Sequence, residues 1–152
     1  MNFNSSIAVK AGLIGAAAGF VVAILGRIPF LGCIIAPLGW LVAVGAGALY
    51  VHFATSGGAA VQIAEGAVGG AVSGGIAGLV NALISGVLAL LFGGVRAATS
   101  ALGRGEVGDA ALGAGIGLVA VIFAIIAGAV FGAVLGAVGG LVYAALKNQQ
   151  KA

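Results

Sequence analysis

Charged residues divide this chain into four long stretches that carry no charge. These stretches cover residues 11–26, 28–64, 66–95 and 110–146. A run of about 18 or more apolar residues is long enough to cross the hydrocarbon core of a bilayer as a helix. The pattern predicts an all-α integral membrane protein with four transmembrane helices. We expect spans near residues 7–25, 34–53, 64–92 and 118–144 within one domain that covers residues 1–152.

Polar and glycine residues predict where these helices begin and end. Ser5 or Ser6 is the expected N-cap of the first helix, because a serine hydroxyl can accept a hydrogen bond from a free backbone N–H. The pair Gly93 and Gly94 is expected to end the third helix. Asp109 is expected to cap the fourth, since a carboxylate suits the positive end of the helix dipole. The third and fourth helices should be the longest and the most closely paired.

Small residues recur at every fourth position of the predicted spans. Such a ridge lets a second helix backbone approach closely in a bilayer, although each interior Gly costs a helix in water about 1 kcal/mol relative to Ala. The spacing predicts glycine-zipper packing of the third helix against the fourth. The expected helix-packing residues are Gly70, Gly74, Gly78, Gly128, Gly132, Gly136 and Gly140. Two shorter ridges of the same kind are present, one formed by Ala11, Gly15, Gly19 and Ala23 and the other by Gly39, Ala43 and Gly47.

Composition supports the membrane class and limits the partners. Hydrophobic residues make up 62% of the chain and charged residues only 6%, whereas soluble domains are about 25% charged. The net charge of +3 is small and scattered, so we expect no nucleic-acid partner. The expected partners are the lipid bilayer and either other membrane subunits or copies of this chain.

Three polar residues of the third helix are candidates for a pore lining or for interhelical hydrogen bonds: Ser73, Asn81 and Ser85. Polar side chains inside a membrane face the bundle interior or a water-filled cavity. An interhelical hydrogen bond is the favoured interpretation of Asn81, and a permeation path is the alternative. No acidic residue lies at the middle of a span, which argues against a proton- or sodium-carrying rotor subunit.

His52 is the single imidazole and the sole candidate ligand for a pigment or haem. Ala48 precedes it by four residues, a spacing that resembles the histidine site of bacterial antenna helices. We favour an interfacial role for His52, together with Trp40 and Tyr50 in aromatic belts at the two membrane surfaces. We expect no metal site, because metals need several convergent ligands. Lipid is the expected bound molecule, and no other cofactor is predicted.

Function is constrained mainly by the scarcity of reactive groups. No pattern resembles a nucleophile and base, a metal cluster or a phosphate loop, so no catalytic residue is assigned and no enzyme activity is expected. The sequence favours a structural or accessory subunit of a larger membrane assembly. A homo-oligomeric pore or small transporter, lined by the polar residues of the third helix, is the alternative.

The expected location follows from a general resemblance to other proteins, and the expected orientation follows from the positions of the basic residues. The chain is similar in style to small prokaryotic four-span proteins, so a prokaryotic cell membrane is the expected location. Cytoplasmic loops usually carry more Lys and Arg residues than loops on the other side of the membrane. Here each side has three basic residues, so this rule does not decide the orientation. Because the N-terminal amine adds one positive charge, we expect cytoplasmic termini. The two sets of basic residues are Lys10, Lys147 and Lys151 beside the termini, and Arg27, Arg96 and Arg104 opposite.

Overall fold

Four helices occupy the part of the chain that the structure describes. The computed structural model describes residues 4–26, 28, 31–56, 61–104 and 107–149, and the side chains of residues 31–36 and 92–118 lie outside that description. The helices are α1 (Ser5–Leu25), α2 (Leu31–Ser56), α3 (Ile63–Arg104) and α4 (Val107–Gln149). Each contains a segment long and apolar enough to span a membrane. The predicted all-α fold with four transmembrane helices is confirmed.

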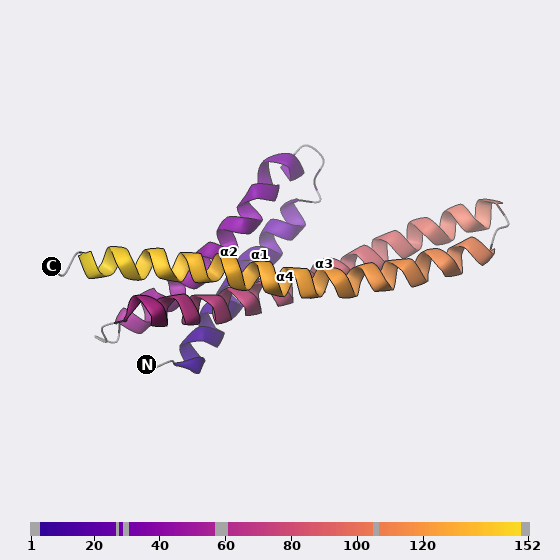
Figure 1. Cartoon of the computed structure of the whole chain (residues 1–152). Coiled ribbons are helices and arrows are strands. Elements are labelled where there is room, and N and C mark those ends of the chain that lie inside the picture. The colour runs from indigo at the N-terminus through magenta and orange to yellow at the C-terminus, as the bar shows by residue number, and fades with distance from the viewer. Residues whose placement is uncertain (1–3, 27, 29–30, 57–60, 105–106, 150–152) are drawn as a thin grey trace.

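The helices form two antiparallel hairpins, α1–α2 and α3–α4, that cross each other (Figure 1). The beginnings of α1 and α3 and the ends of α2 and α4 lie toward the same end of the molecule (Figure 1). Away from that end the two hairpins diverge. The contact between α3 and α4 is the most extensive helix contact, and these are also the longest helices, with 42 and 43 residues. Both expectations for this pair are confirmed.

The first helix is capped by Asn4, and the prediction of Ser5 or Ser6 is wrong. The Asn4 side-chain oxygen accepts hydrogen bonds from the backbone N–H groups of Ser6 at 3.1 Å and Ile7 at 3.3 Å. Asn4 has an extended backbone, with φ −102° and ψ 99°, as an N-cap residue requires. Ser5 and Ser6 are already helical, and the N–H group of Ser6 is one of the two that Asn4 caps.

The two helix boundaries predicted inside the second hairpin are also wrong. Helix α3 continues through Gly93 and Gly94 to Arg104, because interior glycines cost a helix only about 1 kcal/mol each and tertiary pairing outweighs that cost. Helix α4 begins at Val107, so Asp109 belongs to its first turn and does not precede it. The side chain of Asp109 lies outside the described residues.

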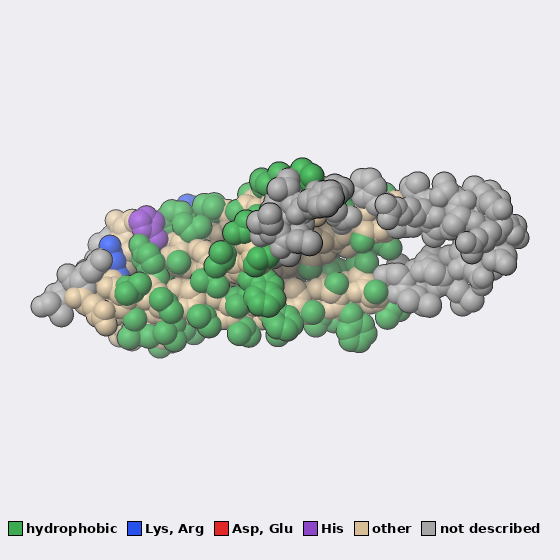
Figure 2. Space-filling view, turned by 90° about the horizontal axis from the view of Figure 1, so that it is seen from above, with side chains coloured by type: hydrophobic (Ala, Val, Ile, Leu, Met, Phe, Trp, Pro, Cys, Tyr) green, Lys and Arg blue, Asp and Glu red, His purple; other side chains and the backbone are tan. Residues whose placement is uncertain are grey.

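The interior is built from small residues, and large apolar side chains point outward. Exposed large side chains occur on all four helices, for example Trp40, Leu91 and Phe123. Hydrophobic side chains cover much of the visible face, whereas charged ones lie toward the end that holds the termini (Figure 2). Outward apolar residues suit contact with lipid tails. The main buried apolar cluster comprises Ala8, Ala11, Tyr50, Val51, Val61 and Ala144.

Tyr50 belongs to this core and not to an interfacial belt, which corrects its predicted position. Its side chain has no exposed surface. The ring occupies the space beside Gly69 of α3, where a Cβ atom would overlap it. The distance of Tyr50 from the helix end predicts an interfacial position, but the missing side chain at Gly69 lets the ring turn inward. Trp40, by contrast, is 72% exposed.

Candidate functional site

The backbones of α3 and α4 meet at four facing pairs of glycines. A Cβ atom on Gly74 would lie 2.7 Å from the Cα of Gly136 and would overlap the carbonyl oxygen of Gly132. A Cβ atom on Gly70 would lie 3.0 Å from the Cα of Gly140. Only hydrogen fits at these positions. The facing pairs are Gly66 with Gly140, Gly70 with Gly136, Gly74 with Gly132, and Gly78 with Gly128.

All seven predicted packing glycines therefore lie in this one contact, and Gly66 joins them. The partner moves back by four residues in α4 for each step of four in α3, which is the register of an antiparallel pair. A four-residue spacing keeps residues near one face of a helix. The contribution of these eight glycines to the free energy of unfolding stays a prediction.

Members of the shorter ridges also pack within the chain, with the exception of Gly39, where a Cβ atom would meet nothing within 4 Å. Gly15 of α1 lies against Ala46 and Ala77, 2.7 and 3.2 Å from where its Cβ would be. Gly47 of α2 lies against the carbonyl of Gly136. Gly139 lies against the backbone of Val44 and was missed, because it falls outside the four-residue ridge that the sequence displays.

Ser73 links two helices and does not face a lumen. Its side chain is fully buried. The hydroxyl donates to the carbonyl oxygen of Ala46 on α2 at 3.0 Å and lies 3.1 Å from the carbonyl oxygen of Gly70 on its own helix. Within this chain Ser73 therefore makes an interhelical hydrogen bond, which is one of the two roles predicted for it.

Asn81 and Ser85 both line a cavity of about 660 Å³. The Asn81 side chain packs over Gly19 of α1, where a Cβ atom would overlap the amide. The Asn81 Oδ1 atom is enclosed and makes no hydrogen bond. The other residues that line the cavity come from all four helices: Gly19, Val22, Ala23, Gly39, Trp40, Val42, Ala43, Ala77, Gly78, Ala82, Gly128, Phe131, Gly132, Val134 and Leu135.

His52 lies at a different place, on the outside of α2 near its end. Its Nδ1 atom is 3.2 Å from the hydroxyl oxygen of Tyr143 on α4, and the two rings meet edge to face. These residues line a shallow cavity of about 340 Å³ with Gly45, Ala48 and Leu49. Trp40 does not line this cavity. The two exposed residues predicted to lie at the membrane surfaces, Trp40 and His52, are therefore in different places. Within the described residues, no three His, Cys, Asp or Glu side chains could hold a metal together.

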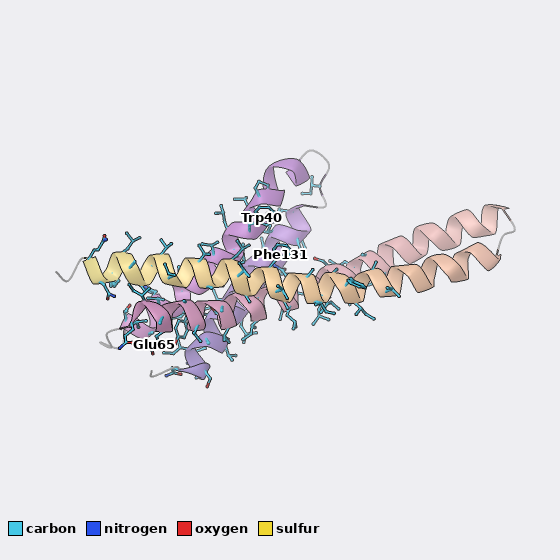
Figure 3. The ribbon with its side chains drawn as sticks, in the orientation of Figure 1. Trp40, Glu65 and Phe131 are labelled. Atoms are coloured by element: carbon cyan, nitrogen blue, oxygen red, sulfur yellow. The ribbon has the colours of Figure 1, made fainter. Side chains whose placement is uncertain are left out.

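Glu65 is the one buried acidic residue in the described part of the chain. It lies in the first turn of α3 and is 8% exposed. Figure 3 shows it near the end that holds the termini, whereas Trp40 and Phe131 lie where the hairpins cross. The sequence places this charge at the start of the third predicted span but does not reveal that its side chain is buried.

The family comparison is decisive for the class of this protein. The profile described as "MJ1491 transmembrane domain" matches residues 9–149. The chain belongs to this family. The match to the MJ1491 transmembrane domain runs from within α1 to the end of α4, so all four helices are part of the family's domain. The protein is an integral membrane protein. Neither the curated proteins nor the solved structures contain a match to this chain.

Proposed function

We propose that this MJ1491-family protein is a non-enzymatic structural or accessory subunit of a larger membrane assembly. The observation that carries the proposal is the length of the second hairpin. Helices α3 and α4 contain 42 and 43 residues, which corresponds to about 63 Å at 1.5 Å per residue. The hydrocarbon core is only about 30 Å thick. The hairpin therefore extends well beyond what a span requires.

The part of this hairpin formed by residues 92–118 is called the arm here. Its described parts, residues 92–104 and 107–118, extend past the crossing with α1–α2, and no other described helix runs beside them (Figure 1). Two short helices bury too little surface to be stable alone in water, and chains below about 40 residues usually need a further partner. A protein partner on the arm would supply that surface. The arm carries four of the nine charged residues, Arg96, Arg104, Glu106 and Asp109, which suits a position outside the bilayer.

The separation of the polar side chains supports the non-enzymatic part of the proposal. Asn81 lies in the large cavity, while His52 contacts Tyr143 on the outside of the bundle. Nucleophilic catalysis needs a nucleophile within hydrogen-bond reach of its base, and His52 instead contacts a tyrosine hydroxyl away from the cavity that holds Asn81.

A homo-oligomeric pore remains the second candidate because Asn81 and Ser85 face one cavity. Several copies arranged around an axis could join such cavities into a polar path. A path without a ring of charged side chains would discriminate poorly between ions. This is the reason for ranking the pore second.

Purification of the tagged full-length chain from its own membrane in a mild detergent, followed by native mass spectrometry, tests the proposal. We expect a stoichiometric complex with a second membrane protein. A variant whose arm is replaced by an unrelated helical hairpin of equal length should keep its four-helix fold and lose that partner. Recovery only as a monomer would contradict the proposal. A homo-oligomer with specific conductance in liposomes, lost in Asn81→Leu, would establish the pore instead.

A further inference from the structure

The large cavity has the dimensions and lining of a small-molecule site. Its volume of about 660 Å³ falls within the range of about 300 to 1,000 Å³ typical of ligand pockets, which are mostly apolar with a few polar groups. Two aromatic residues contribute to its wall, Trp40 from α2 and Phe131 from α4 (Figure 3). They are 72% and 69% exposed, so they stand at an opening toward the surrounding lipid.

Asn81 is the feature of this wall that points to a specific ligand. It lies within the candidate span Ile63–Leu91, where water is scarce and an unsatisfied polar group is costly. Its Oδ1 atom makes no hydrogen bond within the protein. An amide offers two N–H donors and one carbonyl acceptor, and a rotation of the group exchanges their positions. Asn81 lines the cavity, and because Oδ1 is enclosed, the N–H side of the amide is the part that a ligand oxygen could pair with.

We propose that this cavity binds a bilayer-soluble ring compound that carries a carbonyl or hydroxyl oxygen on the ring. The ring packs against Trp40 and Phe131, since aromatic faces favour flat rings. The ring oxygen, whether carbonyl or hydroxyl, accepts a hydrogen bond from the N–H group of the Asn81 amide. The remaining hydrocarbon of the ligand lies along the small residues of α1 and α2.

A phospholipid fits this site less well than a ring compound. Its ester and headgroup oxygens lie at the membrane surface, whereas Asn81 lies inside a span. An acyl chain alone would fill the cavity but would leave the amide without a partner. This inference does not depend on the proposed accessory function, because the cavity is formed within one chain.

Trp40 is the only tryptophan in the chain, so its fluorescence reports on this cavity. The experiment titrates the purified protein in nanodiscs with a decyl-substituted benzoquinone and follows Trp40 quenching. A bound quinone gives saturable quenching, whereas quinone dissolved in the bilayer gives quenching that rises without saturation. We expect a saturable component in the parent protein.

Two glycines of α2 provide a matched pair of blocking and control variants. A Cβ atom at Gly39 or at Gly45 meets nothing within 4 Å, so both positions have open space for the start of a side chain, and unfolding of each leucine variant in detergent checks that its fold is kept. Gly39 lines the large cavity and Gly45 lines the shallow one. Gly39→Leu should abolish saturable quenching, and Gly45→Leu should leave it unchanged.

Asn81→Leu tests the polar contact separately from the shape of the cavity. Loss of one hydrogen bond should weaken the apparent affinity about fivefold to tenfold. Quenching that is non-saturable in the parent, or equal in the parent and Gly39→Leu, would overturn the proposal. An unchanged affinity for the quinone in Asn81→Leu would also overturn the proposal. So would complete loss of saturable quinone quenching when excess phospholipid is added. Either result would show that the cavity binds an acyl chain.

Discussion

Gly74 on α3 and Gly132 on α4 lie so close together that a Cβ atom on either residue would overlap the carbonyl oxygen of the other. The same reciprocal relation holds between Gly70 and Gly136. A helix pair with this geometry has no room for a side chain at the contact. In a bilayer, where lipid tails are as apolar as leucine, such close van der Waals packing is a main source of helix association.

Gly132→Leu should therefore destabilise the protein by about 3 kcal/mol or more, because the branched side chain pushes the α3 and α4 backbones apart. Thermal and denaturant unfolding in detergent measures the change. Gly45→Leu is the control, since its Cβ atom meets no neighbour. If the Gly132 variant unfolds like the parent, the glycine ridge is not a packing device.

Gly69→Ala should destabilise the protein through its contact with Tyr50. The added Cβ atom would overlap the Tyr50 ring, and overpacking of this kind costs about 1 to 3 kcal/mol. Combining Gly69→Ala with Tyr50→Leu should recover part of that loss, because the smaller side chain leaves room. A double-mutant cycle of unfolding free energies measures the coupling. Strict additivity of the two substitutions would refute the contact.

Ser73→Ala should lower the unfolding free energy by about 0.6 kcal/mol, with about 1.7 kcal/mol as the upper bound for such bonds in membranes. The variant removes the hydrogen bond to Ala46 that joins α3 to α2. Ser85→Ala, at the cavity wall, is the matched control and should change stability less. A larger effect for Ser85 than for Ser73 would reverse the assignment of these two hydroxyls.

The absorption spectrum of the protein purified from its own membrane should show protein aromatics alone. His52 is the one imidazole that could act as an axial ligand, and its Nδ1 atom already contacts Tyr143. His52→Ala should therefore leave the spectrum unchanged. A stoichiometric chlorin or haem band that disappears in this variant would make the protein a pigment carrier.

Both termini should lie on the same side of the membrane, and we expect that side to be the cytoplasm. The start of α1 and the end of α4 lie toward one end of the molecule (Figure 1). Single cysteines introduced at Ser5 and Gln149 in a Cys33→Ser background should react with an impermeant maleimide from the same side. A cysteine at Thr99 in the arm should react from the opposite side. Labelling of both sets from one side would contradict this topology.

The sequence by itself determined the class of fold and the helix faces available for packing. Whether a segment can span the membrane depends on its own hydrophobicity. Residues i and i+4 lie on one face of a helix whatever other helices surround it. For this reason the four spans and the seven ridge glycines could be identified before any contact was known. The boundaries were harder, because Gly93 and Gly94 end a helix only where pairing with another helix does not outweigh their cost.

Only the tertiary structure decided which faces meet and what they enclose. Ser73 and Asn81 belong to the same helix and have similar chemistry, yet one bonds to Ala46 and the other lines a cavity. Tyr50 turns inward because Gly69 on another helix leaves space for its ring. These outcomes depend on the crossing of two hairpins, which brings together residues far apart in the chain. Local periodicity describes each helix face but carries no information about the residue that will oppose it.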